Sequence, residues 1–116
     1  MERDVKVKIC GITTETEIGY LNESEADYAG FVFWEKSKRY ITLQKAKKLK
    51  DKLINDIKAV AVMVSPGIEF VKEIENAGFD ILQIHGELKP EVLNKAVKPV
   101  WYAQNIKKSS DIADFG

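Results

Sequence analysis

Ala59-Val60-Ala61-Val62-Met63-Val64 is an unbroken run of six apolar residues near the middle of the chain. Continuous apolarity, in place of strict alternation, is typical of a strand that is covered on both faces, as in a parallel sheet. Other apolar, β-branched runs recur along the chain, and each pair is separated by a segment long enough for a crossover helix. The sequence therefore predicts a parallel α/β fold with five strands: Val5–Cys10, Ala29–Phe33, Ala59–Val64, Ile81–Ile84 and Val100–Ala103.

The intervening segments carry signals for helix starts and ends. Thr14-x-x-Glu17 fits a capping box, in which each side chain bonds a backbone N–H at the start of a helix. Ser65 and Pro66 predict the N-cap and first residue of a later helix, and Gly78 predicts its left-handed end. Four helices are expected to pack an apolar face on the sheet, and the fourth is expected to begin near Pro90. Their apolar residues are, in order, Ile18 and Leu21; Leu43, Ala46, Leu49 and Leu53; Ile68, Val71 and Ile74; and Val92, Leu93 and Ala96. A fifth helix is expected from Ser109 or Ser110.

Composition limits the classes of protein that this sequence can belong to. The 116 residues are 45% hydrophobic, which is ordinary for one globular domain over residues 1–116. The 18 basic and 18 acidic residues cancel, so we expect neither a nucleic-acid partner nor binding to a membrane surface. A single cysteine forms no intrachain disulfide, and no secretory leader is visible, so the expected location is cytoplasmic.

The β-α repeats fit two architectures, an open doubly wound sheet or part of a (β/α)8 barrel. Periodicity does not choose between them. The first strand is followed by Gly11-Ile12-Thr13-Thr14, which has neither the dinucleotide-binding glycine pattern nor a P-loop lysine. The sequence therefore gives no support to a dinucleotide site.

Several polar side chains stand where predicted strands end. Cys10 closes the first strand, where a thiol can reach a ligand, although a lone cysteine is often only a buried packing residue. Gln83 and His85 are two apart at the end of the fourth strand and so share a face, with a structural role for this single histidine as the alternative. No second ligand has metal-binding spacing with His85. Lys8 shares the face of Cys10 but lies deeper, and we expect it to form a buried structural pair instead of activating the thiol.

Four sequence blocks, in this order, span most of the chain: Lys8-Ile9-Cys10-Gly11-Ile12-Thr13, Ala26-Asp27-Tyr28-Ala29-Gly30-Phe31-Val32-Phe33, Lys36-Ser37-Lys38-Arg39-Tyr40-Ile41 and Phe79-Asp80-Ile81-Leu82-Gln83-Ile84-His85-Gly86. Together they resemble the phosphoribosylanthranilate isomerase family of tryptophan biosynthesis. The third block departs from the family pattern, because Lys38 stands where the family has proline.

This resemblance implies a (β/α)8 barrel and a cofactor-free Amadori rearrangement of a small phosphosugar, N-(5-phosphoribosyl)anthranilate, to 1-(2-carboxyphenylamino)-1-deoxyribulose 5-phosphate. It implies Cys10 as the base that removes the C2 proton. Arg39 is the implied partner of the anthranilate carboxylate, because its planar fork suits a planar acceptor; the alternative is a solvated loop charge. Gln83 and His85 are the implied substrate-positioning residues.

The family's later strands are not visible in this sequence. The resemblance implies a general acid, an aspartate at the end of the sixth strand, and phosphate-binding loops after the seventh and eighth. Asp111 and Asp114 fall in the segment expected to begin the fifth helix, so neither fits that acid. About five β/α units form a partial barrel that lacks the last three strands. The sequence favours a fragment of a longer enzyme over a homodimer or half-barrel that self-associates through its open sheet edge. An open-sheet binding module and another phosphosugar barrel are the remaining alternatives.

Overall fold

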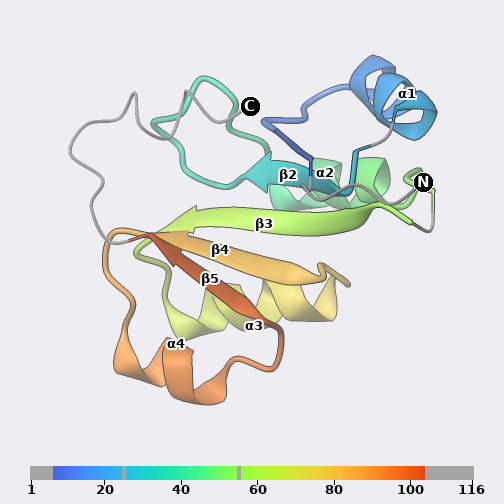
Figure 1. Ribbon diagram of the computed structural model, residues 1–116. Helices are drawn as coiled ribbons and strands as arrows, with labels where there is room; N and C mark the ends of the chain where they lie inside the picture. The colour runs from blue at the N-terminus through green and yellow to red at the C-terminus, as the bar shows by residue number, and fades with distance from the viewer. Residues whose placement is uncertain (1–6, 25, 55, 104–116) are drawn as a thin grey trace.

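Five parallel strands alternate with four helices in the computed structural model, which describes residues 7–24, 26–54 and 56–103. The strands lie in chain order, β1-β2-β3-β4-β5, so each β-α unit adds the next strand on the same side (Figure 1). The predicted parallel α/β fold is confirmed. The elements are β1 Lys8–Cys10, α1 Glu15–Glu23, β2 Tyr28–Val32, α2 Leu43–Lys50, β3 Lys58–Val64, α3 Ile68–Asn76, β4 Ile81–His85, α4 Pro90–Lys95 and β5 Val100–Ala103.

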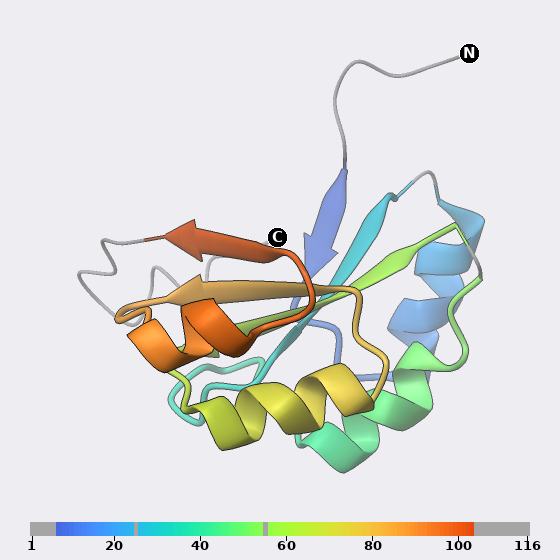
Figure 2. The same ribbon diagram turned by 90° about the horizontal axis from the view of Figure 1, so that it is seen from below.

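Alternate residues of each strand serve two different faces of the sheet. The helices cover one face, which we call the outer face, and none covers the other, the inner face (Figure 2). On β3, Ala61 and Met63 belong to the outer core, whereas Val60 and Val62 belong to the cluster on the inner face. The continuous apolar run of this strand is thus explained by burial on both sides.

The sheet curls strongly toward its inner face. Neighbouring strands lie about 4.8 Å apart, so in a flat sheet side chains on β2 and β5 would be separated by roughly 14 Å. Instead, the rings of Tyr28 on β2 and Trp101 on β5 have centroids 5.1 Å apart. The Lys8 ammonium on β1 lies 6.0 Å from the Trp101 ring. Side chains from strands at opposite edges of the sheet therefore meet on its inner face.

The helix ends agree with local sequence signals in some places and not in others. The Thr14–Glu17 capping box is formed, and Gly78 has a φ of 91° after α3, both as predicted. The predicted start of α3 is wrong, because its N-cap is Gly67. Ser65 instead has a φ of 45°, and its N–H donates to the His85 carbonyl at 2.8 Å. A contact with the next strand therefore fixes Ser65 outside the helix.

Other expectations need smaller corrections. Leu93 is 58% exposed, so α4 buries Val92 and not Leu93. Leu53 lies beyond the end of α2 and still packs against the outer core. Val5, the predicted fifth helix and its two aspartates lie outside the described residues. In the described ranges, every helix is too short or too polar to cross a membrane.

Candidate active site

Cys10 is the last residue of β1, and its thiol packs over a glycine of the neighbouring strand. Cys10 is 7% exposed and pairs in register with Gly30 on β2. A Cβ atom at Gly30 would stand 2.6 Å from the Cys10 Sγ, so the thiol occupies the space that a side chain there would need. Gly11, at a φ of 83°, then turns the chain out of the strand. The predicted position of Cys10 at the strand end is confirmed, and its side chain faces inward.

The surroundings of Cys10 oppose ionisation, and three nearby groups favour it. Burial among apolar side chains raises the pKa of the thiol above its ordinary value. The Lys8 ammonium, the Gly11 N–H and the Arg39 charge each lower that pKa, by smaller amounts. The apolar neighbours on the inner face are Val32, Val60, Val62 and Ile81, with Tyr28, Trp34, Val64 and Trp101 at its margin.

A polar network crosses the inner face from β1 to β4. The Lys8 ammonium donates a hydrogen bond to Gln83 Oε1. Gln83 Nε2 lies 3.0 Å from His85 Nε2. His85 is only 5% exposed, and burial together with the Lys8 charge lowers the pKa of its imidazole. Gln83 and His85 therefore share one face, as predicted, and both are held in place by bonds within the interior.

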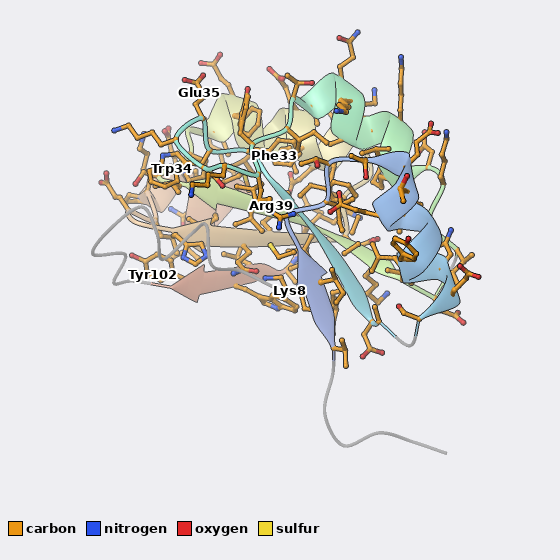
Figure 3. The ribbon with its side chains drawn as sticks, turned by 90° about the horizontal axis from the view of Figure 1, so that it is seen from above. Lys8, Phe33, Trp34, Glu35, Arg39 and Tyr102 are labelled. Atoms are coloured by element: carbon orange, nitrogen blue, oxygen red, sulfur yellow. The ribbon has the colours of Figure 1, made fainter. Side chains whose placement is uncertain are left out.

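Arg39 lies at the rim, over the end of β1, where Figure 3 shows it above Lys8. Its stem packs on Gly11, where an added Cβ would be 2.9 Å from the Arg39 Cγ. Its Nη1 donates to the Gly11 carbonyl at 3.3 Å and to Glu17 Oε2 at 3.4 Å. Within the loop, the buried Ser37 hydroxyl accepts from the Arg39 N–H at 3.1 Å. Arg39 is thus a fixed cation at the mouth of the interior.

Sequence reasoning missed two supporting roles. Lys8 forms a part-buried hydrogen bond with the neutral Gln83 amide, and its charge also acts on Cys10, which corrects the expectation that it does not help the thiol. The sequence does carry a signal for this role, because residues two apart in a strand, such as Lys8 and Cys10, share a face. Glu17 was visible only as a capping residue, yet it also holds Arg39. Since these residues are 22 positions apart, no local pattern indicates that contact.

None of the described residues form a group of three or more histidine, cysteine, aspartate or glutamate side chains that could hold a metal ion. The polar groups of the described interior include the Cys10 thiol, the His85 imidazole, the Gln83 amide and the Lys8 ammonium, with the Arg39 guanidinium at its rim. These groups suit proton transfer and the binding of an anionic organic molecule.

The curled parallel sheet, its outer helices and the polar side chains at its strand ends define a partial (β/α) barrel of the enzyme type. Residues 7–115 match the family model described as N-(5'phosphoribosyl)anthranilate (PRA) isomerase. The chain belongs to this family.

Individual relatives agree with that assignment. The chain is 42% identical over 113 residues to the N-(5'-phosphoribosyl)anthranilate isomerase of Clostridium acetobutylicum, covering 96% of this chain and 55% of the relative. A phosphoribosyl anthranilate isomerase solved with reduced 1-(o-carboxyphenylamino)-1-deoxyribulose 5-phosphate superposes with a TM-score of 0.80 at 33% identity, over 93% of this chain and 57% of that one. Monomers made from a dimeric isomerase of Thermotoga maritima give a TM-score of 0.79 at 35% identity, over 93% and 57% of the two chains. The chain thus spans about half the length of these relatives.

Proposed function

We propose that this chain carries the amino-terminal part of a phosphoribosylanthranilate isomerase and supplies the base and several substrate contacts of the Amadori rearrangement. The observation that supports this most strongly is the shared interior of Cys10, Gln83 and His85, with Arg39 at its mouth. The substrate is N-(5-phosphoribosyl)anthranilate, a small phosphosugar, and the reaction needs no cofactor. A base that is a free thiol requires a reducing compartment, so we also propose a cytoplasmic location.

Each residue has a separate task in this proposal. Cys10, as its thiolate, removes the C2 proton of the ring-opened iminium and leaves an enolamine that tautomerises to the ketone. Arg39 binds the anthranilate carboxylate through its guanidinium fork, which is half exposed and therefore accessible. Gln83 and His85 orient the sugar hydroxyl groups. We assign the acid that protonates the ring oxygen, and the phosphate site, to strands that the relatives have beyond the matched length.

The decay of substrate fluorescence tests this proposal. We expect the 116-residue chain, mixed with or fused to the remaining strands of a relative, to turn over N-(5-phosphoribosyl)anthranilate. Cys10→Ala should reduce the rate at least 100-fold, because the base contributes roughly 10²–10⁴-fold. Lys58→Met, a change at the exposed far end of β3, serves as the control that keeps the rate. An undiminished rate in Cys10→Ala would remove the proposed base.

A second candidate function is self-association through the open edge of β1. Val7 and Ile9 are 38% and 39% exposed there. Between β1 and α1 lies an apolar groove of about 220 Å³, lined by Ile9, Ile12, Tyr20 and Leu21 together with Glu17 and Ser24. An edge of this kind can pair with a second copy of the chain, and a dimeric relative is known from Thermotoga maritima. A stable homodimer in light scattering with no affinity for the substrate would favour this function over the isomerase.

A further inference from the structure

Lys8 is an ionisable side chain that turns into the interior at the β1 end of the polar network. Its ammonium bonds Gln83 Oε1, lies 6.0 Å from the face of Trp101, and shares the inner face of β1 with Cys10. In Figure 3 it lies on the side of β1 that faces β5. The reaction proposed above gives this residue no task.

We propose that Lys8 is a positioning residue that sets the protonation of the interior: its ammonium favours the Cys10 thiolate and, through Gln83, holds His85 neutral with Nε2 as a hydrogen-bond acceptor. A role of Lys8 in catalysis rests on the proposed function. It describes the resting protein, however, and needs no turnover to be tested.

The effect on Cys10 follows from the charges around it. From β1 the thiol faces Lys8, and from the loop after β2 it faces Arg39, which is half exposed and bonded to Glu17. Tyr28 on β2 packs on Trp101, and burial together with the Lys8 charge lowers the pKa of His85 on β4. Among the described residues, Lys8 has a larger effect on the thiol than Arg39 has. A positive charge in a poorly hydrated interior stabilises a nearby anion more than it would in water.

The effect on His85 follows from hydrogen-bond polarity. An ammonium only donates, so Gln83 must turn its oxygen toward Lys8 and its NH2 group toward β4. That NH2 group donates to His85 Nε2, 3.0 Å away, so Nε2 is unprotonated and the imidazole proton sits on Nδ1. The Lys8 charge also opposes a positive imidazole. Among the described residues, the Lys8 ammonium therefore fixes the amide orientation, through it the imidazole tautomer, and it favours the thiolate.

If Lys8 had only a structural role, its removal would change the pKa of Cys10 in the opposite direction. If Lys8 served only to brace Gln83, its removal would loosen the interior and admit water. Because burial is what raises the Cys10 pKa, better hydration would lower that pKa. Under the proposal, loss of the cation raises the pKa. The direction of the change therefore separates the two roles.

Cys10 is the only cysteine in the sequence, so alkylation by iodoacetamide as a function of pH reports on it alone. We expect Lys8→Met to shift the alkylation profile to higher pH and to lower the rate at neutral pH by about threefold or more, since one pKa unit corresponds to tenfold in thiolate. Lys8→Arg should retain the wild-type profile. Lys58→Met is the matched control. Lys8 pairs with Tyr28 and Tyr28 pairs with Lys58, so the two lysines lie in one row across the sheet, but Lys58 is exposed.

His85 is the only histidine, so its imidazole resonances need no assignment. We expect ¹⁵N-detected spectra of the wild-type chain at neutral pH to show a neutral ring with the proton on Nδ1. Because this measurement uses the wild-type chain, it tests the inference even if Lys8→Met does not fold. A proton on Nε2, a charged ring, or an alkylation profile of Lys8→Met that is unchanged or moves to lower pH would overturn the inference. Absent turnover with the expected spectra and profile would instead count against the proposed function alone.

Discussion

At the scale of single residues, the position of the thiol depends on the glycine opposite it. Gly30 faces inward on β2, where its missing side chain leaves room for the Cys10 Sγ. An added methyl group would meet the Sγ at 2.6 Å and the Cys10 Cα, a backbone atom, at 3.2 Å. The thiol could rotate away, but the backbone cannot move without disturbing the pairing of β1 with β2. The geometry of the proposed base is therefore set by two residues.

Gly30→Ala tests this dependence. We expect the substitution to destabilise the chain by about 1–3 kcal/mol through overpacking and to change the alkylation rate of Cys10. Urea unfolding measures the first effect, and iodoacetamide labelling measures the second. Gly19→Ala is the matched control, since Gly19 lies within α1 with nothing within 4 Å of an added Cβ. That change should stabilise the chain by about 0.5–1 kcal/mol. Equal effects at the two positions would contradict the packing argument.

At the scale of elements, the first turn of α1 links a helix cap to the binding cation. Glu17 Oε1 accepts from the N–H groups of Thr13 and Thr14 at 2.8 and 3.1 Å, while its Oε2 lies 3.4 Å from Arg39 Nη1. Burial alone would raise the pKa of Glu17, but the hydrogen bonds from Thr13 and Thr14 outweigh it and hold that pKa below its ordinary value. The folded state therefore gains stability from the ionised carboxylate.

Glu17→Gln removes this charge. Because the folded pKa of Glu17 is lowered, the stability it provides is present above the ordinary glutamate pKa and is lost as the pH falls through the folded value. We expect the substitution to cost about 1 kcal/mol at neutral pH and less in acid. Urea unfolding at several pH values checks this. Glu23→Gln, at the exposed last residue of α1, is the control and should change stability by less than about 0.5 kcal/mol. A cost in Glu17→Gln that does not vary with pH would contradict the electrostatic account.

Local signals predicted the elements well wherever local interactions decide them. The Thr14–Glu17 capping box involves neighbours in sequence, and so the sequence was enough to predict it. Ser65 carries an equally good N-cap signal, but its backbone bonds His85, 20 residues later, and α3 begins beyond it. Leu93 fits the helical spacing, yet α4 turns only Val92 inward. A tertiary contact, which a single sequence does not reveal, accounts for the error at Ser65.

At the scale of the whole molecule, some features of the site follow from local sequence and others depend on tertiary contacts. The end of the first apolar run predicts Cys10 at a strand end, and the alternation of strand residues predicts Gln83 and His85 on one face. The bond between Lys8 and Gln83 joins residues 75 positions apart and exists only because the sheet curls. The burial of Cys10 has the same origin, since its cluster collects side chains from several strands. Curvature is a property of the assembled sheet, and so no single segment of sequence reports it.

The open edge of β1 leads to a prediction about association. Ile9 lies on this edge strand and lines the groove beside α1, and within residues 7–24, 26–54 and 56–103 only β2 pairs with β1. We expect the 116-residue chain to show a mass in light scattering that rises with concentration above that of one chain. Ile9→Lys should shift it toward the monomer, because a charge on an edge strand opposes pairing with another strand. Leu93→Lys is the matched control: Leu93 is also exposed, at 58%, but lies on α4 and not on an edge strand. Equal loss of association in both variants would indicate general hydrophobic clustering, and association that persists in Ile9→Lys would place the contact elsewhere.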